Sequence, residues 1–157
     1  MISLAANIII DGACDAPALV TRQPINFTAA LCKFPNLFPS KRSESQDEHH
    51  ELFRQSIAGT VLIFPSCIGS TYTGLVLLEL VSSERGPAAL VVQKADPLLV
   101  SGVILSEVWY EKSIPVLECP DEELFSAIET GDRVRVELGT GKIGVERPAF
   151  ETDGSMS

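Results

Sequence analysis

The stretch Gly59-Thr-Val-Leu-Ile-Phe-Pro-Ser-Cys-Ile-Gly-Ser-Thr-Tyr-Thr-Gly74 decides the fold that this sequence predicts. Its first part is a strongly apolar run that stops at Pro65, which is typical of a buried strand. The residues from Thr73 to Ser83 are again apolar, and their length, together with the Arg85-Gly86-Pro87 stop, favours a buried helix over a strand. A strand, a glycine-containing loop and a helix in this order predict an α/β unit.

The sequence on both sides of this unit continues the alternation of strands and helices. Asp96 and Pro97 predict the start of a second helix, with Asp as its cap and Pro at its first position, and this helix should run to about Glu107. Buried strands separated by helices imply a partly parallel sheet, so we expect a mixed α/β domain with short flanking helices. The other expected elements are strands at 7–11, 18–21, 88–93 and 114–118, a turn at 12–17, a short helix at 121–129, and a closing hairpin of 133–138 and 142–146.

Length and composition limit the class of protein. The chain has 157 residues and a mass of 16.9 kDa, so we expect one domain over residues 1–148 and a disordered tail at 149–157. Hydrophobic residues make up 45% of the chain, which is enough for a core. The formal net charge of −9 argues against a nucleic-acid partner and against electrostatic docking on anionic lipid.

The charge is unevenly distributed along the chain. Residues 1–80 hold 7 acidic and 5 basic side chains and residues 81–157 hold 14 and 7, so the two halves carry −2 and −7. An anionic ligand is therefore expected on the first half. Residues 39–55 form the one break in composition, and we expect a solvated loop there with a short helical turn at Glu48–Arg54.

Cysteine spacing and hydropathy indicate the compartment. Cys14, Cys32, Cys67 and Cys119 lie far apart, so no pair has the spacing of a zinc knuckle or a redox motif, and free thiols are the simplest interpretation. No apolar run approaches the roughly 20 residues that a membrane-spanning helix needs. The N-terminal residues lack the basic region of a signal peptide. The expected location is therefore the cytoplasm.

The loop between the predicted strand and helix is the candidate site. Gly69 and Gly74 bracket four hydroxyl-bearing residues, Ser70 to Thr73, at the expected N-terminal end of the helix. Gly69 lets the backbone approach a ligand closely, and the hydroxyl and N–H groups can bind a carboxylate or a phosphate in the field of the helix dipole. The alternative is an ordinary helix cap. The loop lacks the lysine of a phosphate-binding loop and the Gly-x-Ser-x-Gly pattern of a nucleophile elbow.

Other chemically capable residues have simpler structural explanations. Cys67 could be a nucleophile, but no histidine lies nearby in the sequence, which favours a packed thiol. No single loop offers a base, its orienting partner and an electrophile together, so this chain is either a binding module or one part of a shared site. We interpret His49 and His50 as surface residues and Trp109 and Tyr110 as core or interface anchors. The acidic residues Asp121, Glu122 and Glu123 fit charges at a helix N-terminus, with metal binding as the minor alternative.

Residues Ser56 to Gly74 resemble the signature of the aconitase X small subunit, the swivel domain. The family's pattern is Ala-Gly-x-Val-Leu-x-x-Pro-Ser-x-x-Gly-Ser followed by Ser or Thr and an apolar helix, and the chain carries this order from Ala58 to Thr71. The segments 86–92, 96–97 and 114–117 also fit. The resemblance covers roughly residues 5–147, and it implies a swivelling β/β/α domain.

The resemblance also implies an activity and a partner. Members of the family are dehydratases in which a large subunit carries the iron–sulfur cluster or iron, and this chain alone would bind neither. By carry-over, Ser70 is the base that accepts a proton, and Ser66, Cys67, Gly69 and Thr71 lie in the substrate-binding loop. A serine base needs its alkoxide stabilised by a helix N-terminus, N–H donors and a cation. We expect the large subunit to supply that cation, because the nearest arginine in the sequence is Arg54.

The substrate is harder to assign from the sequence. The resemblance implies dehydration of cis-3-hydroxy-L-proline, as in bacteria, or of mevalonate 5-phosphate, as in archaea. Archaeal small subunits carry an aromatic-Gly-Gly-Val-Asp stretch after Pro-Leu-Ser-Phe, whereas here Pro24-Ile-Asn-Phe27 is followed by Thr28-Ala-Ala-Leu-Cys-Lys-Phe34. This departure favours hydroxyproline, to be converted to pyrroline-2-carboxylate. The alternatives are a phosphomevalonate dehydratase small subunit, a non-catalytic anion-binding regulatory swivel domain, and an adaptor that binds through residues 39–55.

Overall fold

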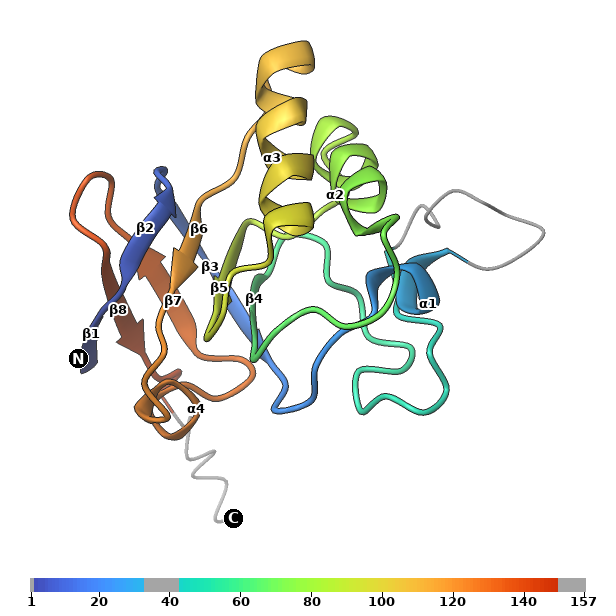
Figure 1. Cartoon of the computed structure of the whole chain (residues 1–157). Helices are drawn as coiled ribbons and strands as arrows, with labels where there is room; N and C mark the ends of the chain where they lie inside the picture. The colour runs from blue at the N-terminus through green and yellow to red at the C-terminus, as the bar shows by residue number, and fades with distance from the viewer. Residues whose placement is uncertain (1, 33–42, 150–157) are drawn as a thin grey trace, which may run out of the picture.

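A computed structural model describes residues 2–32 and 43–149, in which strands dominate and the helices are short (Figure 1). The strands are β1 (Ile2–Ala5), β2 (Asn7–Ile10), β3 (Cys14–Val20), β4 (Val61–Phe64), β5 (Ala89–Val92), β6 (Val116–Glu118), β7 (Arg133–Val136) and β8 (Lys142–Glu146). The helices are α1 (Phe27–Leu31), α2 (Thr73–Ser82), α3 (Pro97–Tyr110) and α4 (Glu123–Ala127).

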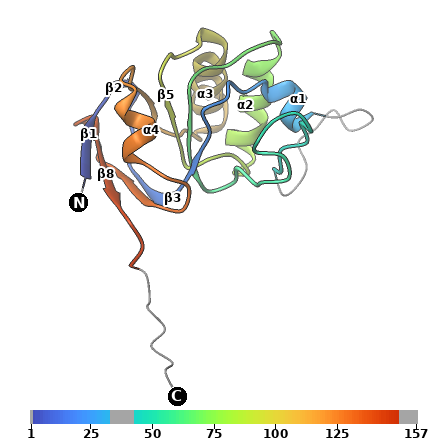
Figure 2. The ribbon, with the colours of Figure 1, turned by 90° about the horizontal axis from the view of Figure 1, so that it is seen from below.

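Within the described residues, all strands belong to one sheet, in the order β1-β8-β7-β3-β4-β5-β6-β2. The strands β3, β4, β5 and β6 pair in parallel, and every other pairing is antiparallel. The first and last strands of this order, β1 and β2, are separated in sequence by Ala6 alone. The sheet therefore curls into a nearly closed barrel whose two ends are joined through the chain, as Figure 2 shows from below.

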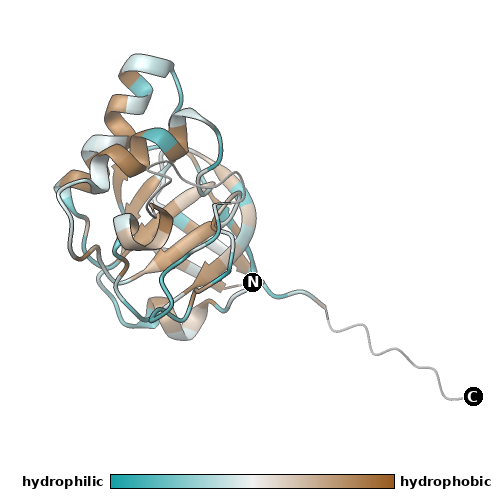
Figure 3. Cartoon of the chain, turned by 90° about the vertical axis from the view of Figure 1, so that its right-hand side faces the viewer, coloured by the Kyte–Doolittle hydropathy of each residue, from teal (hydrophilic) through white to brown (hydrophobic). Residues whose placement is uncertain are grey.

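The parallel strands are buried on both faces. Along β4, Leu62 and Phe64 pack with α1, α2 and α3 outside the barrel, whereas Val61 and Ile63 face the barrel interior. This alternation follows from the two-residue period of a strand. Because both faces are covered, β4 reads as an unbroken apolar run, and the central strands are mostly brown in Figure 3. The expected mixed α/β fold is confirmed.

Two glycines let the N-terminal end of α2 pack closely on the first half of α3. A Cβ atom at Gly102 would overlap the carbonyl oxygen of Gly74, and a Cβ at Gly74 would lie 3.0 Å from the carbonyl oxygen of Leu98. Direct backbone contact fixes where α2 begins. Because the candidate loop runs into that helix end, the position of the loop depends on the same contact.

We expect Gly102→Val to destabilise the domain by about 2–4 kcal/mol, because the two helix backbones must separate to admit the side chain. Urea unfolding followed by circular dichroism measures this loss. Ile104→Ala is the matched control on the exposed side of α3, and it should cost less than about 1 kcal/mol. Equal losses in the two variants would contradict the role of the helix contact.

Helices α2 and α3 confirm the sequence-based prediction. Helix α2 covers residues 73–82, close to the expected 73–83. Helix α3 begins at Pro97, and the side chain of Asp96 accepts hydrogen bonds from the backbone N–H groups of Leu98 (2.8 Å) and Leu99 (3.3 Å). It continues to Tyr110, beyond the predicted end at Glu107, before Glu111 adopts a left-handed conformation with φ of 56°.

The N-terminal part differs from the prediction in two places. The expected turn at 12–17 is wrong beyond Gly12, because β3 already begins at Cys14. Pro17, which has no backbone N–H to donate, is tolerated there because residues 14–17 pair with β7 on one side only. The pairing of β3 with β4 on the other side begins at Ala18. The sequence also predicted one strand near the N-terminus, at 7–11, where the structure has β1 and β2.

The segment 43–55 is not the solvated loop that its composition predicted. Ser43, Ser45 and Leu52 are buried, and the backbone N–H of Gln46 donates to the carbonyl oxygen of Ala30 on α1. The predicted helical turn at 48–54 appears as hydrogen-bonded turns without a helix. Polar composition failed here because backbone groups of the segment and the hydroxyl of Ser43 pair with neighbouring elements. Residues 39–42 of the predicted loop and 150–157 of the predicted tail lie outside the described residues.

No helix within residues 2–32 and 43–149 has both the length and the apolar composition that crossing a bilayer requires.

Candidate functional site

The candidate loop follows the carboxyl end of β4 and leads into α2. Its first carbonyl oxygen, that of Pro65, accepts hydrogen bonds from the backbone N–H groups of Gln93 and Lys94, each 3.1 Å long. These residues follow β5, so the loop is held between the ends of two parallel strands. This is the edge at which α/β sheets usually bind ligands.

The segment that follows β3 holds the loop from its other side. Ile25 forms an isolated parallel bridge with Cys67. Its N–H donates to the carbonyl oxygen of Ser66 at 3.0 Å, and its carbonyl oxygen accepts from the N–H of Ile68 at 3.0 Å. The middle of the loop is therefore anchored as firmly as a short piece of sheet.

Gly69 is required at its position for two independent reasons. Its φ of +88° lies in the region that side chains with a Cβ disfavour. In addition, a Cβ at Gly69 would overlap the Nδ2 atom of Asn26 and lie 2.9 Å from its Cγ. The glycine lets the chain turn directly against Asn26 and presents the next residue, Ser70, at the helix end.

Ser70 is half-buried and lies at the N-terminal end of α2. Its Oγ accepts a hydrogen bond from the backbone N–H of Tyr72 at 3.0 Å, and its carbonyl oxygen accepts from Oγ1 of Thr73 at 2.9 Å. Tyr72, the cap position, provides no side-chain capping bond, and the first N–H group of α2, that of Thr73, donates to the Ser70 carbonyl oxygen at 3.4 Å. The donor to Oγ and the helix dipole both favour negative charge on the Ser70 oxygen.

Ser66, Cys67, Gly69 and Thr71 lie on the same loop as Ser70, as the sequence predicted. Ser66 is half-buried and fixed through its backbone, whereas Thr71 is exposed between Ser70 and Tyr72. Cys67 packs against the core outside the barrel. Burial, and secondarily the negative charge of Asp96, raises the pKa of the Cys67 thiol to about 12. A thiol so hard to ionise is a packed group and no nucleophile at neutral pH.

We expect Cys67 to resist alkylation in the folded protein. With a pKa near 12 in place of 9.0, its thiolate fraction at pH 8 falls roughly a thousandfold. Iodoacetamide labelling of a variant with Cys67 as its only cysteine should therefore be far slower in buffer than in urea. The same shift lowers stability as pH rises from 9 toward 12, because the unfolded chain loses this proton first. Equally fast labelling in buffer and in urea would contradict the assignment.

The histidines that the sequence singled out are not part of the loop. Nδ1 of His50 lies 3.1 Å from the N–H of Leu52 and must accept from it, so Nε2 carries the hydrogen and donates to the carbonyl oxygen of Pro24, also at 3.1 Å. His50 thus holds the 43–55 segment against the residues that precede Asn26. The N–H of His49 donates to the Asp47 carboxylate.

The other candidates are likewise away from the loop or structural. Oδ1 of Asp121 accepts from the N–H of Glu123 at the start of α4, which agrees with the predicted helix-terminal role. Trp109 and Tyr110 are exposed at the far end of α3, so of the expected core or interface role the core role is wrong for both, and the interface role stays a prediction. Among the described residues, no three His, Cys, Asp or Glu side chains gather as a metal site would require.

Two residues beside the loop were not singled out by the sequence. Asn26 caps α1, with Oδ1 accepting from the N–H of Ala29 at 3.1 Å, and its side chain covers Gly69. Lys94 is exposed next to Pro65. An Asn before the apolar segment 27–31 is a helix-start signal that could have located α1. The pairing of residue 25 with residue 67 is long-range, and nothing in the sequence indicates it.

The whole domain matches a known family pattern. Residues 3–145 match the Aconitase X swivel domain. The chain belongs to this family. The mixed sheet with its few short helices is the aconitase X swivel fold, and the sequence-based interpretation as a small subunit of an aconitase X-type dehydratase is confirmed at this level.

Named relatives and solved structures agree with the family. The chain is 32% identical to the phosphomevalonate dehydratase small subunit of Archaeoglobus fulgidus over 88% of this chain and 95% of the relative. It is 33% identical to that of Methanopyrus kandleri over 83% and 87%. The crystal structure of Thermococcus kodakaraensis aconitase X in its holo-form matches with a TM-score of 0.75 at 25% identity, covering 92% and 98%. A solution NMR structure of a UPF0107 protein matches with a TM-score of 0.74 at 30% identity, again covering 92% and 98%.

Proposed function

We propose that this swivel domain is the small subunit of a phosphomevalonate dehydratase and that Ser70 is its base. The observation that carries the proposal is the position of Ser70, whose Oγ accepts the Tyr72 N–H at the start of α2. The loop that holds it carries the family's Pro-Ser-x-x-Gly-Ser pattern. The relatives that match over most of the chain are named phosphomevalonate dehydratase small subunits.

Dehydration removes a proton from one carbon and a hydroxyl group from its neighbour. Ser70 Oγ takes the proton, the C–H electron pair becomes the second bond of the new C=C, and the C–O bond breaks as the hydroxyl leaves as water. A serine alkoxide is too basic to persist in water, so its negative charge must be stabilised. The Tyr72 N–H and the N-terminus of α2 supply part of that stabilisation.

This chain does not complete the site by itself. The guanidinium of Arg54, the arginine nearest in sequence, lies over the Phe53 ring, with its Cζ 5.0 Å from the ring centroid. Lys94, the exposed cation beside Pro65, makes no side-chain hydrogen bond or ion pair with the part of the chain that the structure describes. We assign the stabilising cation to the large subunit. If Ser70 acts as a base only when the large subunit covers it, each subunit alone is inactive.

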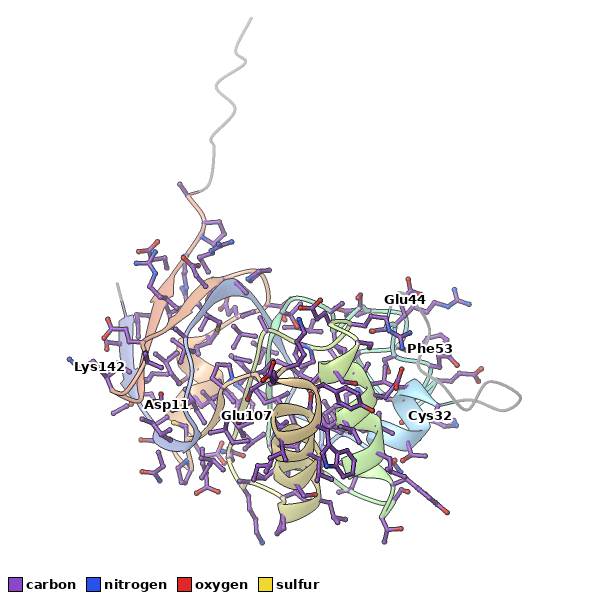
Figure 4. The ribbon with its side chains drawn as sticks, turned by 90° about the horizontal axis from the view of Figure 1, so that it is seen from above. Asp11, Cys32, Glu44, Phe53, Glu107 and Lys142 are labelled. Carbon is purple, nitrogen blue, oxygen red and sulfur yellow. The ribbon has the colours of Figure 1, made fainter. Side chains whose placement is uncertain are left out.

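The cysteines of this chain do not fit an iron–sulfur cluster. A cluster needs thiolates gathered around one point, but the four cysteines are dispersed, and no three His, Cys, Asp or Glu side chains of the described residues gather as a metal site would require. Cys14 and Cys119 pack at the barrel, whereas Cys32 ends α1, on the opposite side from Asp11 and Lys142 in Figure 4. We accordingly place the cluster or iron in the large subunit.

Exposed apolar side chains lie on both sides of Ser70 in the sequence. Ile68, Tyr72 and Leu75 are 53%, 61% and 59% exposed, and all lie within five residues of the serine. Large apolar groups beside a catalytic residue are expected where another protein surface covers them. They support docking of the aconitase X large subunit over this loop.

The relatives favour phosphomevalonate over the hydroxyproline substrate that the sequence departure suggested. Thr28 to Leu31, which replace the archaeal Gly-Gly motif, form α1. Residues 33–34 of the departing stretch lie outside the described residues. This local departure carries less weight than a match over most of the chain.

An activity screen of the reconstituted pair tests the proposal. We expect co-expression with the large subunit to give an iron-containing complex that dehydrates mevalonate 5-phosphate and leaves cis-3-hydroxy-L-proline untouched. Turnover of hydroxyproline alone would overturn the substrate assignment while keeping the enzyme class. Failure to bind any large subunit would instead favour a non-catalytic anion-binding domain.

A further inference from the structure

The C-terminal end of α3 carries an exposed apolar patch. Val108, Trp109 and Tyr110 are 69%, 62% and 56% exposed, and Ile104, one turn earlier, is 45% exposed. The buried stripe of the helix stops at Ser106, so packing within the domain does not account for these side chains. Figure 1 shows this end of α3 projecting beyond α2. We call the four exposed residues the α3 tip.

The α3 tip lies far from Ser70. Helix α3 starts at Pro97, and its first half contacts the start of α2 through Gly102 and Gly74, next to the candidate loop. The helix has 14 residues. At a rise of about 1.5 Å per residue, the helix is about 20 Å long. The tip is therefore at the end of α3 that points away from the Ser70 loop.

We propose that the α3 tip is a permanent docking site for the aconitase X large subunit, separate from the contact over Ser70. This inference rests on the two-subunit assembly of the proposed function. A site shared between two chains must open in each turnover so that substrate enters and product leaves. The contact over Ser70 is broken in that step, so it cannot by itself keep the subunits together. A contact about 20 Å away persists while the Ser70 end opens, with α3 as a rigid arm between the two.

The residue types at the tip suit a stable contact. Trp and Tyr are enriched among the residues that contribute most to protein–protein binding, because they bury a large area at a low cost in conformational entropy. Ile104 and Val108 are four residues apart and are therefore neighbours on one helix face. The tip thus presents an aromatic anchor beside an aliphatic ridge, and this surface fits an apolar pocket on the partner.

The charges around the tip favour the large subunit over a second copy of this chain. Glu107 and Glu111 flank the tip, and neither carboxylate forms an ion pair within the described part of the chain. The neighbouring Lys112 is already paired with Glu84 at 2.9 Å. A symmetric dimer would bring the unpaired carboxylates of both copies together, and each copy carries a net charge of −9. The partner surface is therefore an apolar pocket with a basic rim.

Binding measurements on the two subunits test the proposal. We expect Trp109→Ala to raise the Kd between this chain and its large subunit by at least about 30-fold. At a saturating concentration of large subunit, kcat and KM for mevalonate 5-phosphate should be unchanged, because the tip does not touch the site. Leu138→Ala is the matched control, since Leu138 is 66% exposed between β7 and β8, and it should leave Kd unchanged. Glu107→Lys should raise Kd and reduce its dependence on salt concentration.

Fluorine NMR reports on the contact itself. Fluorotryptophan incorporated into this chain gives a single resonance, because Trp109 is the only tryptophan. We expect the resonance of the isolated chain to be independent of its concentration, and to shift when unlabelled large subunit is added. It should stay at the bound position while substrate is turned over, because the anchor does not open with the site.

The outcomes distinguish this inference from the proposed function. Failure of the wild-type chain to bind a large subunit would overturn both. Binding without turnover of mevalonate 5-phosphate would overturn the substrate assignment and leave the Kd comparison decisive for the tip. Equally tight binding by wild type and Trp109→Ala would overturn this inference alone. So would a Trp109 resonance that shifts with the concentration of the isolated chain, because a second copy would then be the occupant.

Discussion

Replacing Ser70 with alanine is expected to lower kcat of the reconstituted enzyme by about 1,000-fold or more, because the proton acceptor is removed. KM should change little, since the hydroxyl contributes mainly when the proton moves. The fold should tolerate the change, because Ser70 is only half-buried and its Oγ loses a single hydrogen bond, from the Tyr72 N–H. Steady-state kinetics, with iron content and subunit stoichiometry measured on the same preparation, checks this result.

Ser126→Ala is the matched control for Ser70→Ala. Ser126 lies on α4, is exposed, and donates its hydroxyl to the carbonyl oxygen of Glu123 within the same helix. Its replacement should leave kcat unchanged. Near-normal turnover by Ser70→Ala in an intact, iron-loaded complex would rule out Ser70 as the base.

Gly69→Ala is expected to lower kcat about 100-fold or more through displacement of Ser70. The added Cβ meets the Asn26 carboxamide, and the backbone at φ of +88° is strained for alanine, so the turn must shift. A displacement of about 1 Å at a catalytic group costs a factor of this order. We also expect a stability loss of about 1–3 kcal/mol, measured by urea unfolding of the isolated domain.

Gly59→Ala isolates the backbone contribution. Gly59 has a similar φ of +68°, but nothing lies within 4 Å of a Cβ built there. Its replacement should reduce stability by a comparable backbone strain and leave kcat unchanged. If both variants lost stability equally and both kept full activity, the contact between Gly69 and Asn26 would have no part in placing Ser70.

The part of the fold that the sequence predicted well depends on local signals. The apolar run before Pro65, the loop glycine and the Asp96-Pro97 helix start are each set by residues within one element or its cap. They were enough to place Ser70 between a strand and a helix. The β8–β7 hairpin was also predicted, because its turn lies between adjacent strands.

The remainder depends on contacts between distant residues. Pro17 looked like a turn residue because the sequence does not show that only β7 pairs with β3 at that point. Ser43 looked solvated because its partners, the backbone groups of Ile57 and Arg85, belong to other segments. Asn26 was overlooked for the same reason, since its importance comes from a glycine far along the chain.

The closure of the sheet has a consequence for the order of folding. The β3–β4–β5–β6 strands with α2 and α3 form through neighbouring strand–helix–strand units, whereas β1 must pair Ile2 with Val145 of β8. Pairings this distant in sequence form slowly, because the chain between them must first be brought together. We expect the strand–helix half to become protected early in refolding and β1 and β8 to be protected last. During synthesis, the N-terminal strand would wait for nearly the whole chain to emerge before it could take its place.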